Sequence, residues 1–133
     1  MDHLYLLFVD DNEEFLASAT RFVSATTDIT VVGWARSAEE AIEKANRLRP
    51  HLVLTDLALP GMNGLELARR LKALPGAPRV ILLTLDNESV DGRALAAGAG
   101  LDGVVAKSKF GSTLLPLVFA LFPSRRSERA AEA

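Results

Sequence analysis

The sequence predicts an α/β protein with a doubly wound five-stranded parallel sheet and helices on both faces. Short apolar runs alternate along the chain with longer segments whose apolar residues recur at helical spacing. The runs are apolar throughout instead of alternating with polar residues, which is typical of parallel strands covered on both faces. Strands that alternate with helices form such a sheet. Right-handed crossovers then leave few topologies.

The run from Leu52 to Thr55 is the predicted strand around which the rest of the chain is organised. It is short and apolar, it is preceded by Pro50, and the turn formers Pro60 and Gly61 follow a few residues later. Asp56 stands directly after the run. Ligands of open α/β sheets bind at the carboxyl ends of the strands. Asp56 is therefore the first candidate for chemistry.

The first predicted strand, Leu4 to Val9, is a continuous apolar run that ends in Asp10 and Asp11. We expect these two acids to share an edge of the sheet with Asp56. Asn12 can cap the helix that follows. The apolar residues of this helix form one stripe that we expect in the core, namely Phe15, Leu16, Ala19, Phe22 and Val23.

The second predicted strand runs from Ile29 to Trp34, and Trp34 at its end is more typical of packing than of ligand stacking. Ser37 and Glu40 form an S-x-x-E capping box that opens the next helix, and Pro50 ends it. The inner face of this helix is predicted to carry Ala38, Ala41, Ile42, Ala45 and Leu48.

The second half of the chain repeats the pattern. Asn63 and Glu66 follow the same capping logic for a helix that runs to about Leu74. The fourth strand, Val80 to Leu83, ends at Thr84. We therefore expect the Thr84 hydroxyl at the same edge of the sheet as the aspartates.

A further helix is predicted after Ser89, with Gly100 as its C-terminal stop. The short fifth strand, Gly103 to Ala106, brings Lys107 to the edge where the aspartates lie. The apolar residues of the helix before it are Ala94, Leu95, Ala97 and Ala99.

The last helix is predicted from about Thr113 to Phe122, and Pro116 is tolerated there only in the first turn. No charged residue occurs in this run, so the helix is apolar all round. One face must pack on the sheet, and we expect the other to expose leucine or phenylalanine as an interaction surface. The hypothesis is that the isolated chain self-associates through this helix, with Phe119 or Phe122 as an anchor.

Composition limits the class of protein. The 133 residues are 49% hydrophobic, carry a formal net charge of −2 and include no cysteine. This is typical of one globular domain without a disulfide framework, and it gives no sign of nucleic-acid binding. No apolar run is long enough for a membrane span, so the cytoplasm is the expected compartment. We predict one domain over residues 1–122, with residues 123–133 as a polar tail or the start of a linker.

The strand ends gather one set of polar side chains, which are Asp10, Asp11, Asp56, Thr84 and Lys107. Three crowded carboxylates repel one another and raise each other's pKa unless a cation joins them. Hard oxygen ligands suit Mg²⁺. A lysine and a hydroxyl beside the metal suit a phosphoryl group. The chemistry implied is phosphoryl transfer to a carboxylate.

On these residues the sequence resembles the receiver domains of bacterial two-component response regulators. The matching motifs are FVDDN around Asp10 and Asp11, LVLTDLALPGMNGLEL around Asp56, VILLT at Thr84 and GVVAK at Lys107. The ordered set is specific, and the resemblance covers about residues 4–122. It implies a flavodoxin-like fold of the receiver type, and a histidine kinase or phosphotransfer protein as the phosphoryl donor.

The resemblance also implies a role for each matching residue. Asp56 would be the phosphoacceptor. Asp11 and Asp56, with the backbone carbonyl of Ala58, would hold Mg²⁺, and Asp10 would help through water. Thr84 and Lys107 would contact the phosphoryl oxygens, and the output and homodimer surface would be the face made by the fourth helix, fifth strand and fifth helix.

Two positions depart from the pattern of many receivers. Val104 stands three residues before the lysine, where many receivers carry an aromatic that swings inward on phosphorylation, so that rotamer switch is absent. Ser108 follows the lysine where many have proline, so the cis peptide that proline favours is not implied. Neither change removes a group that phosphotransfer needs.

Other interpretations of the same residues are weaker. An aspartyl phosphatase needs a second acid two residues after the nucleophile, and Ala58 stands there. A phosphorylation-independent pseudo-receiver binding module usually shows losses among the acids or the lysine, and none is lost. A flavodoxin-like nucleotide binder would need a glycine-rich phosphate loop after the first strand, and this chain has none there. With only His3 and His51 and no cysteine, the chain does not offer the usual ligand set of a zinc site. We therefore expect a phosphoacceptor signalling domain with Mg²⁺-dependent self-phosphorylation and slow autodephosphorylation, not an enzyme with a separate substrate.

Overall fold

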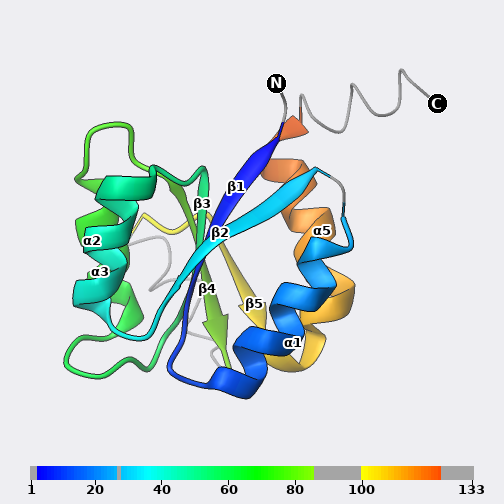
Figure 1. Cartoon of the computed structure of the whole chain (residues 1–133), viewed down its shortest axis with the longest axis horizontal. Coiled ribbons are helices and arrows are strands. Elements are labelled where there is room, and N and C mark those ends of the chain that lie inside the picture. Colours follow the sequence, from blue (N-terminus) through cyan, green and yellow to red (C-terminus); the bar gives the residue numbers. More distant parts are fainter. Residues whose placement is uncertain (1–2, 27, 86–99, 124–133) are drawn as a thin grey trace.

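The computed structural model describes residues 3–26, 28–85 and 100–123, and these form a sheet with helices on both sides (Figure 1). The helix predicted around Ala94 to Ala99 lies outside the described residues, as does the tail after Pro123. The elements along the chain are β1 (Leu4–Val9), α1 (Glu13–Ser24), β2 (Ile29–Ala35), α2 (Ala38–Leu48), β3 (Leu52–Asp56), α3 (Gly64–Lys72), β4 (Arg79–Thr84), β5 (Gly103–Ala106), the 3₁₀ turn η1 (Lys107–Lys109) and α5 (Phe110–Leu121).

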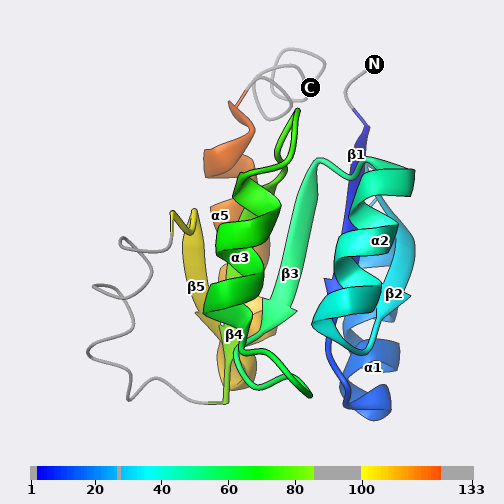
Figure 2. The same ribbon diagram turned by 90° about the vertical axis from the view of Figure 1, so that its left-hand side faces the viewer.

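The five strands are all parallel and lie in the order β2-β1-β3-β4-β5. Helices α1 and α5 cover one face, and α2 and α3 cover the other (Figures 1 and 2). The predicted doubly wound α/β fold is therefore confirmed. The chain leaves β1 toward β2 on one side and reaches β3 on the other, so the ends of β1 and β3 flank the point where the strand order reverses. This is where such sheets bind ligands.

Alternate residues of β1 belong to two separate cores. Leu6 and Phe8 face the core beneath α1 and α5, while Leu7 and Val9 face the core beneath α2 and α3. A strand buried on both sides must be apolar at every position, which explains the continuous apolar runs in the sequence. None of the described helices is long and apolar enough to cross a membrane.

Side-chain caps begin three of the helices. Asn12 Oδ1 accepts from Phe15 N (3.0 Å), Ser37 Oγ from Glu40 N (3.2 Å) and Asn63 Oδ1 from Glu66 N (2.9 Å). The glutamates do not complete the predicted capping boxes. Glu40 accepts from the backbone N–H of Arg36, one residue before the cap, and the Glu66 carboxylate pairs with arginines of its own helix.

The predicted core stripe of α1 is partly wrong. Leu16, Ala19 and Val23 are buried, but Phe15 is half-buried and Phe22 is 37% exposed. The two rings lie toward the side of the helix that faces α5, where both make T-shaped contacts with Phe110. In α2, similarly, the alanines of the inner face are buried and the larger Ile42 and Leu48 are half-buried.

The last helix begins at Phe110, earlier than predicted, so Pro116 lies inside it and not in its first turn. Gly111 and Ser112 are weak helix formers that hid this start, but the Phe110 ring is anchored in the core. Pro116 is exposed, where water can bond the carbonyl that loses its partner. The large apolar residues predicted to be exposed on α5 are instead half-buried, namely Leu115, Leu117, Phe119, Leu121 and Phe122.

Candidate functional site

Three aspartates meet where β1 and β3 end. One ligating oxygen from each of Asp10, Asp11 and Asp56 lies within 4.8 Å of the other two. Asp10 is fully buried, Asp56 is 7% exposed and Asp11 is exposed. The cluster therefore has an inner wall of two buried carboxylates and an outer one open to solvent.

Lys107 completes this cluster. Its Nζ lies 2.6 Å from Asp10 Oδ2 and 3.4 Å from Asp56 Oδ2, and its side chain is only 11% exposed. The same Nζ lies 4.6 Å from the centroid of the Phe15 ring. The lysine is thus enclosed between two carboxylates and one aromatic face, and it is not a solvated surface charge.

The buried carboxylates are poorly supplied with hydrogen-bond donors. Asp10 Oδ1 accepts from Asn12 N (2.9 Å), but Oδ2 is buried without an aligned hydrogen bond despite its ion pair. Asp56 Oδ1 has a long contact from Ala58 N (3.4 Å). Burial raises the pKa of Asp56, and the negative charge of Asp10 raises it further, while Lys107 and the Ala58 N–H only partly offset both.

Thr84 and Ala58 lie at the same edge. Thr84 is the last residue of β4 and is 5% exposed; its neighbour Leu83 pairs with Asp56 in the sheet, and Thr84 itself pairs with Ala106, the residue before Lys107. Ala58 follows β3 and is exposed. The structure therefore gathers every predicted site residue at one end of the sheet.

Gly64 is a site residue that the sequence reasoning missed. It opens α3, and a Cβ atom placed there would lie 2.3 Å from the carbonyl oxygen of Asp56 and 3.0 Å from Leu57 Cα. Its N–H donates to the Leu57 carbonyl (2.7 Å). Only glycine lets α3 approach so closely, and this contact fixes the loop after Asp56. The sequence did contain a signal for this close approach, which is a glycine at the first position of a helix capped by Asn63.

Phe15 is a second residue whose place in the site was missed. Its helical spacing indicated core, and nothing in the spacing showed that its ring face would lie beneath the Lys107 ammonium.

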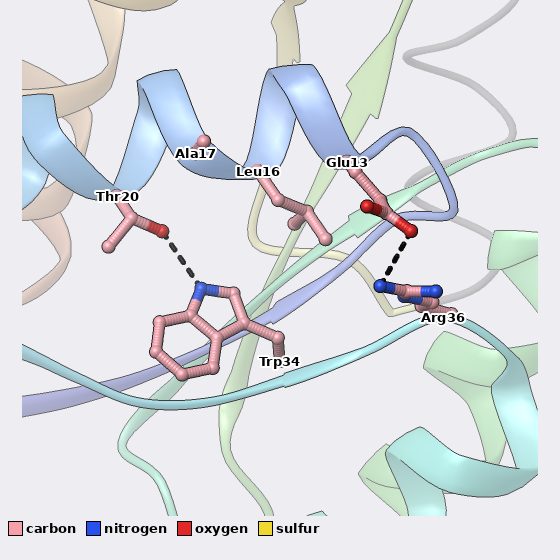
Figure 3. A pocket seen from close by; sticks show the side chains of 6 residues that line it. All are labelled: Glu13, Leu16, Ala17, Thr20, Trp34 and Arg36. Carbon is pink, nitrogen blue, oxygen red and sulfur yellow. Dashed lines mark hydrogen bonds and ion pairs between the residues drawn. The ribbon is translucent and has the colours of Figure 1, made fainter.

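A separate hollow of about 360 Å³ lies between α1 and the edge strand β2. Figure 3 shows the Trp34 indole along it, with its Nε1–H donating to Thr20 Oγ1 (2.9 Å). Its two charged lining residues, Glu13 and Arg36, pair with each other at 2.7 Å. This hollow has an apolar floor and no cluster of acids, so it does not share the chemistry of the aspartate site. Trp34 is 44% exposed, so the predicted packing of this residue is incomplete.

Comparison with known proteins agrees with this geometry. Residues 6–118 match the family model described as "Response regulator receiver domain". The chain is 36% identical over 102 residues to the nitrate/nitrite response regulator protein NarL of Escherichia coli (strain K12), covering 77% of this chain and 47% of NarL. It is 36% identical over 110 residues to the response regulator protein VraR of Staphylococcus saprophyticus, covering 82% of this chain and 52% of VraR. The chain thus spans about half the length of these curated relatives.

Solved structures show the same fold. A two-component response regulator of the LuxR family from Aurantimonas sp. superposes with a TM-score of 0.84 at 28% identity, over 92% of this chain and 87% of that one. The signal receiver domain of the putative response regulator NarL from Mycobacterium tuberculosis gives 0.79 at 25% identity, over 95% and 98%. The matched family model, the relatives and the acid cluster at the switch point lead to one conclusion: the chain belongs to the receiver domains of two-component response regulators.

Proposed function

We propose that this receiver domain takes up a phosphoryl group on Asp56 from a phosphohistidine donor and passes the change on as a conformational signal. The observation that carries the proposal is the position of Asp56 Oδ2, which lies 3.4 Å from Lys107 Nζ within a cluster of three aspartates. The Asp56 carboxylate has a raised pKa and accepts few hydrogen bonds. Such a perturbed group is typical of a site where a reaction takes place.

The donor set fits a divalent cation such as Mg²⁺. Asp10 Oδ2 is buried without an aligned hydrogen bond, and the oxygens of the three aspartates converge. We propose that Asp11, Asp56 and the backbone carbonyl of Ala58 hold the ion, with Asp10 acting through water. When bound, the ion neutralises the charge that builds up on the phosphoryl oxygens.

The transfer itself requires little covalent chemistry from the protein. An ionised oxygen of Asp56 attacks phosphorus, a new O–P bond forms, and the P–N bond to the donor histidine breaks with its electron pair left on the imidazole nitrogen. Lys107 holds a positive charge beside the attacking oxygen, where it attracts the phosphoryl group. The imidazole then takes up a proton from water.

Thr84 and Lys107 are proposed to report the new group. Both lie at the β4 and β5 ends next to Asp56, and their contacts to phosphoryl oxygens exist only after transfer. Val104 on β5 is half-buried and too small to act as an aromatic switch. The response must therefore pass through the ends of β4 and β5 without that side chain.

The donor is proposed to be a histidine kinase or a phosphotransfer protein, because the relatives are response regulators. We propose a signalling domain in the cytoplasm with no membrane or direct nucleic-acid contact of its own. The pseudo-receiver alternative is not favoured, since the three acids are present and clustered and the lysine pairs with Asp10 and Asp56.

The experiment is intact-protein mass spectrometry after incubation with acetyl phosphate and Mg²⁺. We expect one phosphoryl group on the wild-type chain, none on Asp56→Asn, and none when a chelator removes the metal. Asp10→Asn and Asp11→Asn should weaken Mg²⁺ binding.

Asp102→Asn is the matched control, since Asp102 has a similarly exposed carboxylate with a lysine partner but lies away from the aspartate cluster. Folded Asp102→Asn protein should be labelled normally. Retained labelling of Asp56→Asn would overturn the assignment.

A further inference from the structure

The enclosed position of Lys107 raises the question of what holds its ammonium when the carboxylates are engaged elsewhere. Its contacts to Asp10 and Asp56 are the shortest that it makes to charged groups. These are the same carboxylates that the proposed function assigns to the metal and the phosphoryl group. A lysine held only by them would lose its position when they turn to another partner.

The Phe15 ring is a contact of a different kind. Nζ lies 4.6 Å from its centroid, within the range of a cation–π interaction. The ring carries no charge and offers no oxygen ligand, so an ion such as Mg²⁺ does not compete for it. Because the lysine side chain is only 11% exposed, the contact is largely shielded from water. Cation–π interactions are strongest when they are shielded in this way.

The Phe15 ring is held in place by the two chain segments that carry Asp10 and Lys107. The segment carrying Asp10 sets the backbone, because Asn12 N donates to Asp10 Oδ1 (2.9 Å) and Asn12 Oδ1 accepts from Phe15 N (3.0 Å). The segment carrying Lys107 sets the ring, because Phe110 and Phe15 make a T-shaped contact with centroids 5.5 Å apart and an angle of 80°. Phe110 is itself buried and lies three residues after the lysine.

We propose that Phe15 is a positioning residue for phosphoryl transfer, whose ring face holds the Lys107 ammonium toward Asp56. This proposal rests on the proposed function for its kinetic consequence, but the positioning itself is a property of the chain without metal or phosphate.

Phe22 supplies a matched control. It lies on the same helix and packs against the same Phe110 ring, with centroids 5.8 Å apart and an angle of 66°. Lys107 lies over Phe15, however, and not over Phe22. Phe15→Leu and Phe22→Leu therefore both remove a T-shaped aromatic contact from Phe110, and only the first removes the aromatic face beneath the lysine.

The first measurement is made on the metal-free protein by NMR. The ε-methylene protons of Lys107 should be shifted upfield by the ring current of Phe15 in the wild-type chain and in Phe22→Leu, and this shift should vanish in Phe15→Leu. Equal Lys107 shifts in wild type and Phe15→Leu would overturn the proposal.

The second measurement is the rate of labelling by acetyl phosphate at saturating Mg²⁺. We expect Phe15→Leu to be slower on the order of tenfold, which is the effect of losing a desolvated cation–π contact, and Phe15→Tyr and Phe22→Leu to stay near the wild-type rate. Phenylalanines with increasing numbers of ring fluorines at position 15 keep the shape but weaken the π face, and the rate should fall step by step.

Equal slowing in Phe15→Leu and Phe22→Leu, or a rate that is independent of ring fluorination, would make the role of Phe15 purely structural. A wild-type chain that is never labelled on Asp56 would instead contradict the proposed function. The ring-current shift would still decide the positioning of the lysine.

Discussion

Two carboxylates in this domain have almost the same exposure, but their pKa values are shifted in opposite directions. The side chain of Asp56 is 11% exposed and that of Asp102 is 12% exposed. Asp56 lies where β3 ends, and Asp102 lies just before β5 begins, at the opposite end of the sheet. Burial raises the pKa of Asp56, with a further rise from Asp10, whereas the pKa of Asp102 is lowered.

The difference comes from the donors that surround each group. Burial alone would also raise the pKa of Asp102, but its oxygens accept from Lys72 Nζ (2.6 Å), from the Val80 backbone N–H (2.8 Å) and from Arg79 Nη1 (3.0 Å). Asp56 has one lysine at 3.4 Å and a second carboxylate beside it. Asp102 thus joins α3, β4 and β5 and stabilises the fold, while Asp56 is left with capacity for a ligand.

The largest expected effect is on stability when each acid loses its charge. Asp102→Asn should lower the free energy of unfolding by about 2–4 kcal/mol, because it removes charge-assisted hydrogen bonds and leaves Lys72 without its counter-charge. Asp56→Asn should change it by less than about 1 kcal/mol or raise it, because the repulsion from Asp10 is relieved. Urea unfolding at neutral pH without metal measures both. Equal losses would mean that the donor sets do not matter.

The pH dependence of unfolding should separate the two groups further. The folded-state pKa of Asp102 lies below its ordinary value of 3.8, so its contribution is complete above that value and is lost as the pH falls through the folded pKa. For Asp56 the folded pKa lies above 3.8, so its charge lowers stability as the pH rises from 3.8 through the folded value.

Urea midpoints of the wild type and of each variant across the acidic range measure this dependence. The deficit of Asp102→Asn should shrink below pH 3.8, and the difference between Asp56→Asn and wild type should shrink there as well. A deficit of Asp102→Asn that stays constant down to the lowest pH would show that the lost stability is not electrostatic.

Glycines near Asp56 give a smaller test of how tightly its loop is held. Gly64→Ala places a Cβ against the Asp56 carbonyl, and we expect a loss of about 1–3 kcal/mol together with slower labelling. Gly61 has φ 79°, and no atom lies within 4 Å of the place that a methyl group would take, so Gly61→Ala should cost only the left-handed backbone strain of about 1–2 kcal/mol. Labelling rates of the two variants decide whether the close approach of α3 matters for Asp56. Equal rates would mean that it does not.

The sequence predicted most of the frame because the relevant forces are local or periodic. Apolar runs marked the strands, and Asn12, Ser37 and Asn63 marked helix starts through caps that the structure contains. Because parallel strands end at a common edge, the order of Asp10, Asp56 and their partners along the chain was enough to bring them together.

What could not be predicted depends on contacts between distant segments. The start of α5 at Phe110 is set by a ring that packs against α1 and β1, not by the propensity of Gly111 and Ser112. The donors around Asp102 come from α3 and β4, and nothing in the local sequence distinguishes this aspartate from one at a turn. The ring beneath Lys107 is a contact of the same kind.

The last prediction extends the comparison to apolar groups, because α5 also has side chains that are either satisfied or left for a partner. Leu117, Leu121 and Phe122 pack against the core beneath α1 and α5, and the exposed positions of the helix carry small residues and Pro116. The apolar side chains of α5 thus already have partners within the chain, as the Asp102 carboxylate does and the Asp56 carboxylate largely does not. In place of the self-association expected from the apolar sequence of this helix, we therefore expect the unmodified chain to be monomeric at tens of micromolar. A homodimer through a face that includes β5 and α5 should require the phosphorylated state.

Analytical ultracentrifugation of the wild type, with and without acetyl phosphate and Mg²⁺, measures this directly. Phe119→Glu and Phe122→Glu should lower the urea midpoint, because a charge then replaces a half-buried ring that already has contacts within the chain. They should leave the sedimentation of the unmodified protein unchanged. A different result would contradict this expectation: the metal-free wild type is a dimer, and Phe119→Glu abolishes the dimer without loss of stability. In that case α5 would be a surface available to a second copy of the chain, as Asp56 is a carboxylate available to a ligand.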